Sequence, residues 1–176
     1  KIERIVIPPD PKTMKVQFVK TNRSGDQVVV MKDLEKSWTR PDGSLHRVFS
    51  FFSGVIERGN RIALTGVNGA GKSTLLKVIT GETEPTGGSS QMGNSVQLGY
   101  FSQYSSDVLR PQKTIFEEVS ERLPLASIAS IKAILGSFQF SGDDADTKIS
   151  VLSGGEKSRV MLACILALPI NFLVLD

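Results

Sequence analysis

The chain has 176 residues, of which 40% are hydrophobic and 22% are charged, and its formal net charge is +3. This composition favours a soluble α/β domain with one core, and no apolar run approaches the roughly eighteen residues that a membrane-spanning helix needs. The single cysteine, Cys164, excludes an internal disulfide framework.

Charge is concentrated at the start of the chain. Residues 1–25 hold six Lys or Arg residues and two acidic residues, a local charge of +4, so the remainder sums to −1. The run Pro8-Pro9-Asp10-Pro11 favours an extended connector over a helix. A basic extended leader of this kind suits an ordinary solvated tail.

Two apolar runs, residues 28–31 and 48–51, are expected to be strands that turn around residues 41–43. They predict a β-subdomain. A further strand is expected at residues 61–65, directly before a glycine-rich loop, and a helix over residues 75–79 behind it.

The loop between that strand and that helix fits the pattern G-x-x-x-x-G-K-[ST]. Its glycines let successive backbone N–H groups point at an anion, and the helix N-terminus adds its positive dipole. Lys72 would reach the β- and γ-phosphates, Ser73 would bind Mg²⁺, and Thr74 would hydrogen-bond a phosphate oxygen. We therefore expect ATP and Mg²⁺ as ligands. The expected binding residues are Gly66, Asn68, Gly69, Ala70, Gly71, Lys72, Ser73 and Thr74.

The middle of the chain alternates turn signals with regular elements. Gly81 should end the helix, and residues 85–90 should turn into the next strand. A strand-like run over residues 96–101 leads to Gln103. Thr114 with Glu117 forms a capping box that begins a helix running toward Arg122.

A second helix is expected over residues 127–138, and the two helices make a small helical subdomain. The acidic residues 142–146 lack the ligand spacing of a calcium loop, so we expect a solvated loop there.

Residues 152–159 read Leu-Ser-Gly-Gly-Glu-Lys-Ser-Arg. Ser153 and Glu156 form a capping box that opens an apolar helix, on which Cys164 should be a buried small hydrophobe. Gly154 and Gly155 in its first turn each cost roughly 1 kcal/mol of helix propensity. That pair is expected where a partner such as a γ-phosphate must approach the backbone closely.

Together with the phosphate loop, this octet resembles the signature motif of ABC-type ATPases. The resemblance implies that Ser153, Gly154, Gly155 and Glu156 close over a nucleotide held by the phosphate loop of an opposite domain. It also implies the fold class: an α/β P-loop NTPase core of ABC ATPase type, with an antiparallel β-subdomain and a short helical subdomain.

The same resemblance assigns roles to three further residues. Gln103 looks like the Q-loop glutamine, which helps to hold Mg²⁺ and senses the γ-phosphate. Asp176, at the end of the apolar run 171–175, looks like the Walker B aspartate and would hold Mg²⁺ through water. These two are the expected catalytic residues. Trp38 stands where the family carries an adenine-stacking aromatic; it is either that residue or a core or surface aromatic.

The motif Glu156-Lys157-Ser158-Arg159 is similar to that of the ABC-F group, because transporter subunits usually have glutamine in place of Glu156. Residues 59–64 and 75–82 are also similar to that group, and the 49 residues from Gln103 to Leu152 suit its short helical subdomain. The resemblance implies two ATPase domains in one soluble polypeptide without membrane segments, in the cytoplasm or an organelle stroma. Many members act on the ribosome.

On this basis we expect residues 1–25 to be the tail of an interdomain linker that reaches toward RNA. We expect residues 26–176 to be the second ABC ATP-binding domain, truncated at the Walker B aspartate. The family's catalytic glutamate would then follow Asp176, so the isolated fragment should not hydrolyse ATP. The only histidine, His46, precedes the phosphate loop and cannot be the family's switch histidine. The expected partners are a second ATP-binding domain, from the same full-length chain or a homodimer, and the ribosome.

Two alternatives remain open. The chain could be the ATP-binding subunit of a membrane transporter, against which the Glu156–Arg159 sequence speaks. It could also be a nucleotide-gated binding module with little turnover, and the identity of the residue after Asp176 would separate that module from an ATPase.

Overall fold

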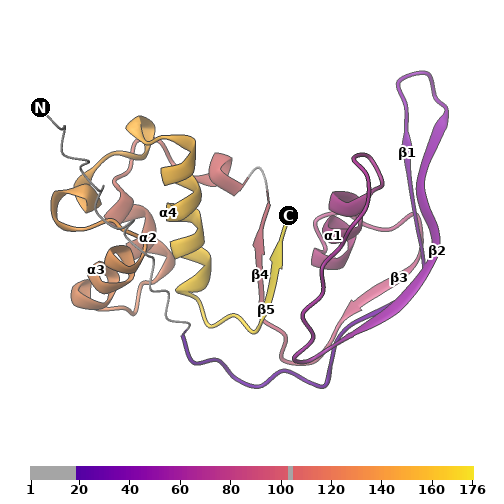
Figure 1. Cartoon of the computed structure of the whole chain (residues 1–176), viewed down its shortest axis with the longest axis horizontal. Coiled ribbons are helices and arrows are strands. Elements are labelled where there is room, and N and C mark those ends of the chain that lie inside the picture. Colours follow the sequence, from indigo (N-terminus) through magenta and orange to yellow (C-terminus); the bar gives the residue numbers. More distant parts are fainter. Residues whose placement is uncertain (1–18, 103–104) are drawn as a thin grey trace, which may run out of the picture. The chain divides into compact units, whose positions relative to one another are not determined.

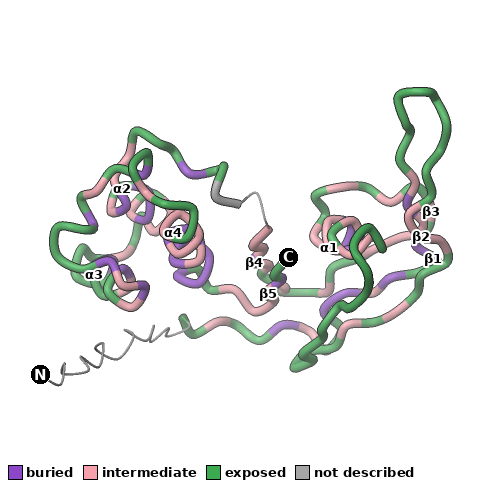
Figure 2. Tube along the Cα trace, turned by 45° about the horizontal axis from the view of Figure 1, so that its top comes forward, coloured by how far each residue is buried: buried purple, intermediate pink, exposed green. Residues whose placement is uncertain are grey.

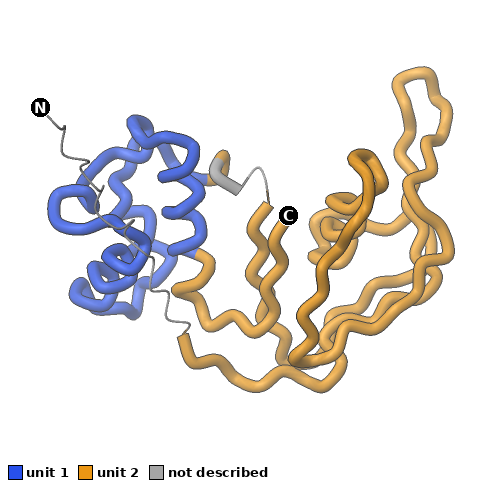
Figure 3. The backbone as a smooth tube through the Cα atoms, in the orientation of Figure 1, with its two compact units in different colours: residues 1–18, 109–164 blue, residues 19–108, 165–176 orange. Residues whose placement is uncertain are grey.

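A computed structural model describes residues 19–102 and 105–176 of the chain. The described chain forms two compact units (Figure 3). The helical unit comprises residues 109–164, and the sheet unit comprises residues 19–108 and 165–176. Within the described residues, no helix has the length and apolar character needed to cross a membrane.

The larger sheet of the sheet unit is antiparallel, with the order β2-β1-β3 (Figure 1). Its strands are β1 (Gln27–Thr39), β2 (Leu45–Glu57) and β3 (Gly87–Met92). The predicted strands at residues 28–31 and 48–51 are confirmed, although β1 and β2 extend well beyond them. Their turn is closed by the Arg40 N–H, which donates to the Ser44 carbonyl oxygen at 2.8 Å.

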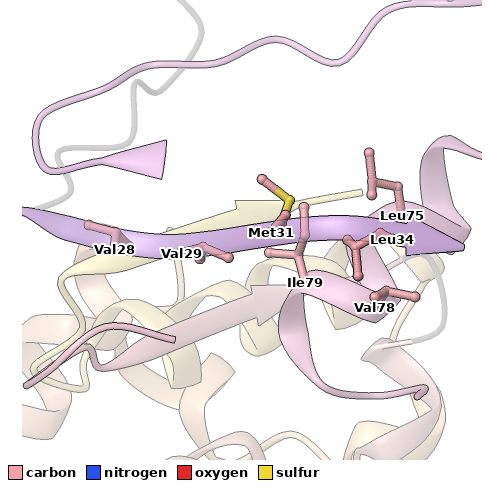
Figure 4. Close-up of a cluster of buried hydrophobic side chains, with 7 residues drawn as sticks. All are labelled: Val28, Val29, Met31, Leu34, Leu75, Val78 and Ile79. Carbon is pink, nitrogen blue, oxygen red and sulfur yellow. The ribbon is translucent and has the colours of Figure 1, made fainter. Parts of the chain in front are cut away.

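The phosphate-loop helix α1 (Lys72–Thr80) packs against this sheet. Figure 4 shows its apolar side chains beside those of β1 in one buried cluster. The cluster consists of Val28, Val29, Met31, Leu34, Leu75, Val78 and Ile79. Gly81 ends the helix in the left-handed conformation, with φ 79°, as predicted. Burial of one apolar face thus fixes the helix that follows the phosphate loop.

A second sheet of this unit pairs β4 (Leu98–Phe101) with β5 (Phe172–Leu175) in parallel. Both strands were predicted, and Phe172 also packs against the buried cluster of β1 and α1. Because Asp176 directly follows β5, its backbone N–H can donate to the Phe101 carbonyl oxygen, at 2.9 Å. The end of β5 is thereby fixed beside the end of β4.

Two sequence predictions in this unit are wrong. No strand forms at residues 61–65; they are exposed, and Ile62 retains 64% of its accessible surface (Figure 2). An apolar run becomes a strand only where a neighbour supplies ladder hydrogen bonds, which the apolar pattern itself does not provide. The turn predicted over residues 85–90 is shorter, because β3 already begins at Gly87, opposite Glu35.

The helical unit holds α2 (Ile115–Arg122), α3 (Ile128–Ser137) and the residues of α4 (Gly154–Leu166) up to Cys164. Short 3-10 turns η2 (Gly142–Asp146) and η3 (Ile149–Val151) precede α4, and a third, η1 (Ser105–Val108), lies in the sheet unit. The capping box of α2 is confirmed: Thr114 Oγ1 accepts from the Glu117 N–H at 3.1 Å, and Glu117 Oε2 accepts from the Thr114 N–H at 2.8 Å. The second predicted helix is α3, capped by Ser127.

A buried carboxylate ties α2 to the segment before it. The fully buried Glu118 accepts hydrogen bonds from Arg122 Nη2 at 2.8 Å and from Arg110 Nε at 3.0 Å. Burial acts to raise the pKa of Glu118, but the hydrogen bonds and charges of the two arginines outweigh it and hold that pKa below its ordinary value. A buried charge is tolerated when it is paired in this way, so the network fixes the start of the helical unit.

Cys164 is almost completely buried, as predicted for a small apolar side chain on the signature helix. Burial raises the pKa of its thiol to about 11, so the reactive thiolate is scarce at neutral pH. The residue contributes packing and no chemistry.

Candidate functional site

The glycine-rich loop connects the exposed segment 61–65 to α1 and is itself exposed. Gly69 and Gly71 have left-handed backbones, with φ 82° and 89°. A Cβ at Gly71 would also collide with the Val48 side chain of β2. The last glycine of the loop therefore meets two requirements at once, a left-handed turn into α1 and close contact with the sheet.

Lys72 is the first residue of α1, and its side chain folds back over the loop. Its Nζ donates to the carbonyl oxygens of Gly66 at 2.9 Å and Val67 at 3.0 Å. An ammonium group has three N–H donors, so this arrangement leaves one for an incoming anion. A positive charge is thus held beside the N-terminus of α1, where the helix dipole also favours a phosphate.

Ser73 and Asp176 are 103 positions apart in sequence but touch in the structure. Ser73 Oγ donates to Asp176 Oδ1 at 2.8 Å. A hydroxyl and a carboxylate are oxygen donors of the kind that Mg²⁺ prefers, and Mg²⁺ commonly keeps several waters beside one or two protein ligands. The pair predicted to handle Mg²⁺ is therefore brought together, and its donor set fits that ion.

Tyr100, which sequence reasoning missed, lies beside the same carboxylate. Its hydroxyl donates to Asp176 Oδ2 at 3.4 Å. Burial first, and then the negative charges of Asp176 and Glu82, raise the pKa of Tyr100 to about 12, so it remains a neutral donor. The only sequence signal for it was its place at the end of an expected strand, close to Gln103.

Trp38 is 43% exposed near the end of β1 and is not a core residue. Its neighbour Lys36 pairs with Phe49 of β2, which contacts the α1 cluster, and Val48 of β2 lies against Gly71 of the loop. The strand pair that carries Trp38 is therefore in contact with the phosphate loop. Gln103, the other predicted residue of this site, lies outside the described residues.

The signature motif lies in the helical unit, where its predicted capping box is confirmed. The Glu156 N–H donates to Ser153 Oγ at 3.4 Å, and the Ser153 N–H donates to Glu156 Oε2 at 2.8 Å. Ser153 Oγ also donates to that carboxylate oxygen at 2.7 Å. Hydrogen bonds from the Ser153 side chain and backbone, together with the Arg159 charge, hold the pKa of Glu156 below its ordinary value. The carboxylate therefore stays ionised and orients the serine hydroxyl.

Gly154 and Gly155 begin α4 and are exposed. Among the described residues, apart from the helix's own backbone, no atom lies within 4 Å of where a Cβ would stand at either glycine. Internal packing therefore does not require these glycines. Their open backbone is what an approaching ligand would need.

Comparison with known proteins agrees with this geometry. The family described as "ABC transporter" matches residues 50–176, which is more than half of the chain, so the chain belongs to that family. The solved structure "Dimeric Structure of MJ0796, a Bacterial ABC Transporter Cassette" has a TM-score of 0.71 over 84% of this chain and 73% of that one. At 22% identity it shows the fold, an α/β ABC ATPase cassette.

The sequence relatives place the chain in the ABC-F group of this family. "ABC transporter F family member 5" of Arabidopsis thaliana is 38% identical over 175 residues, 99% of this chain and 25% of that protein. "Energy-dependent translational throttle protein EttA" of Haemophilus influenzae is 35% identical over 176 residues, 98% of this chain and 29% of that protein. The chain thus spans between a quarter and a third of the length of these relatives.

Proposed function

We propose that the chain binds ATP with Mg²⁺ at the phosphate loop. The observation that carries this proposal is the 2.8 Å hydrogen bond between Ser73 Oγ and Asp176 Oδ1, which joins the two predicted Mg²⁺ residues at the N-terminus of α1. A glycine turn alone would not need a carboxylate at that place. ABC ATPases as a family bind ATP with Mg²⁺, and membership of that family gives the proposal its second support.

The residues of the loop have different binding roles, which follow from their chemistry. Backbone N–H groups of Gly69 and Gly71 and the Lys72 ammonium hold the phosphates, because an anion is favoured by amide donors, a cation and a helix N-terminus together. Ala70 lies between the two glycines, and its N–H donates to the Val67 carbonyl oxygen at 3.2 Å. Ser73 and Asp176 would hold Mg²⁺ by their oxygens, Asp176 through water. Mg²⁺ would neutralise charge that develops on the transferred phosphoryl group.

The remaining binding residues complete the proposal. Gly66 and Asn68 shape the loop, Thr74 bonds a phosphate oxygen, and Gln103 helps to hold Mg²⁺ and senses the γ-phosphate. Trp38 supplies a stacking surface for adenine, which fits its 43% exposure on the strand pair that contacts the loop.

Hydrolysis requires a second ATP-binding domain in this proposal. Ser153 and the Gly155 N–H complete the site of that partner, with Gly154 and Glu156 shaping the turn. The exposed, unobstructed backbone at the two glycines supports this role. The similar solved structure of MJ0796 is a dimeric cassette, which supports pairing of this kind. Closure would place fixed dipoles around the reacting phosphate, the largest usual contribution to such catalysis.

For the whole protein we propose an ABC-F ATPase that acts on the ribosome in translation. Its support is the similarity to a relative named as a translational throttle protein, together with the basic residues of the first 25 positions. Those positions, apart from 19–25, lie outside the described residues, so their proposed role as a linker tail that contacts RNA rests on charge and proline content.

The test is ATPase activity of the full-length protein with and without purified ribosomes, beside a Lys72→Ala version. Stimulation by ribosomes that disappears with Lys72→Ala is expected. Activity that ribosomes do not change would point to a transporter or another ABC machine. Binding of ATP without turnover would point to a nucleotide-gated binding module.

A further inference from the structure

Lys36 is a buried lysine of β1 whose ammonium group is held in one place. The residue is only 8% exposed, and its Nζ donates to the Glu84 carbonyl oxygen at 2.6 Å and to Thr83 Oγ1 at 3.2 Å. A buried ammonium needs such acceptors, because an unpaired buried charge is costly. Two of its three donors are thereby used.

The turn that provides these acceptors is itself bonded to β1. The Thr86 N–H donates to the Glu35 carbonyl oxygen at 2.7 Å, and the Ser37 N–H donates to Thr86 Oγ1 at 3.0 Å. The turn that follows α1 is therefore held against β1 by hydrogen bonds. Because this turn carries both acceptors, it also fixes the position of the Lys36 ammonium.

The same ammonium lies over the ring of Trp38, with Nζ 4.3 Å from the ring centroid. This distance is within the range of a cation–π interaction, which is strongest with tryptophan. Since Lys36 occupies one face of the indole, any group that stacks on Trp38 must use the other face. The Trp38 residue as a whole remains 43% exposed, so it is not covered by the rest of the described chain.

We propose that Lys36 is a positioning residue for the nucleotide base: it holds the Trp38 ring as a fixed platform on which the adenine of ATP stacks. The inference rests on the proposed function, and specifically on the stacking role of Trp38. A side chain fixed before binding loses less rotamer freedom when its ligand arrives, so the contact raises affinity without touching the ligand.

The chain's single tryptophan makes this proposal directly measurable, because tryptophan emission, excited selectively over that of the two tyrosines, comes from Trp38 alone. ATP and inorganic tripolyphosphate are titrated by calorimetry into wild type, Lys36→Met, Trp38→Ala and the double variant. Lys36→Met should weaken ATP binding by about three- to tenfold and shift the Trp38 emission. Tripolyphosphate, which has no base, should bind all four proteins equally.

Two matched substitutions serve as controls. Lys36→Arg keeps a cation beside the ring and should retain most of the affinity for ATP. Lys32→Met removes an exposed lysine from the same strand and should change neither ATP binding nor emission.

The double variant decides whether Lys36 acts through Trp38. In the Trp38→Ala background, Lys36→Met should change ATP affinity by less than about twofold, since there is no ring left to position. An equal loss in both backgrounds would overturn the proposal, as would unchanged ATP affinity and emission in Lys36→Met. Failure of wild type to bind ATP would instead reject the nucleotide site itself.

If Lys36→Met does not fold, as judged by circular dichroism, Thr83→Val takes its place. That variant removes one acceptor and loosens the ammonium while preserving its charge. It should shift Trp38 emission and weaken ATP binding in the same direction, and unchanged values for both would overturn the proposal.

Discussion

Alanine substitutions at three glycines separate backbone strain from steric conflict in the two nucleotide motifs. Gly71 combines a φ of 89° with a Cβ position that would collide with Val48. Gly69 has a φ of 82° but no described atom within 4 Å of that position. Gly155 lies in the first turn of α4 with neither a left-handed φ nor a close neighbour among the described residues.

The expected changes in unfolding free energy follow from these differences. A left-handed backbone costs a non-glycine residue about 1–2 kcal/mol, which is the destabilisation expected for Gly69→Ala. Overpacking adds about 1–3 kcal/mol, so Gly71→Ala should lose about 2–5 kcal/mol. Gly155→Ala should be neutral or gain up to about 1 kcal/mol, because alanine is the better helix former.

Urea unfolding followed by two signals measures this series. Trp38 emission reports the sheet unit, which contains Gly69 and Gly71, and far-ultraviolet circular dichroism reports the helices, including α4. The reasoning is refuted if Gly71→Ala is as stable as Gly69→Ala. It is also refuted if Gly155→Ala lowers stability by more than about 1 kcal/mol.

Three further predictions concern titrating groups. The pKa of Tyr100 is raised from 10.0 to about 12, so Tyr100 should contribute stability that is present below pH 10 and lost as the pH rises from 10 to 12. A difference titration against Tyr100→Phe should show its phenolate absorbance appearing near pH 12. Ionisation of Tyr100 near pH 10 would contradict this prediction. Glu118, whose pKa is lowered by Arg110 and Arg122, should contribute stability that is present above its ordinary value of 4.5 and lost as pH falls below it. Acid unfolding of Glu118→Gln should lack that loss, and identical pH dependence would argue against the buried pair. Cys164 should react with a thiol reagent only after unfolding, whereas rapid labelling of the folded chain would show that its thiol is accessible.

Local signals in the sequence were sufficient to predict several helix ends. Each of these signals involves residues within a single helical turn, so it can be recognised from the sequence alone. Examples are the capping boxes at Thr114 and Ser153 and the helix end at Gly81. Ser73 and Asp176 were both expected to hold Mg²⁺, Asp176 from the family resemblance, and the structure adds that the two side chains are in contact.

Features that depend on distant residues could not be read in this way. The Lys36 ammonium that lies over Trp38 is bonded to Thr83, which is 47 positions away, and Tyr100 is bonded to Asp176, which is 76 positions away. The register shifts between β1 and β2 around Asp33, with φ 46°, likewise have no local signature. At residues 61–65 the sequence predicted a strand that does not form. An apolar pattern does not reveal whether a neighbouring strand is present to pair with it.

The most direct test of the central claim is calorimetric binding of ATP to the chain with and without Mg²⁺, in wild type, Lys72→Ala, Ser73→Ala and the control Lys77→Ala. Wild type and Lys77→Ala should bind ATP more tightly with Mg²⁺. Lys72→Ala should lose about tenfold or more in affinity, since it removes a charge-assisted contact with phosphate. Ser73→Ala should lose the Mg²⁺ dependence. ATP binding by Lys72→Ala at wild-type strength would contradict the account.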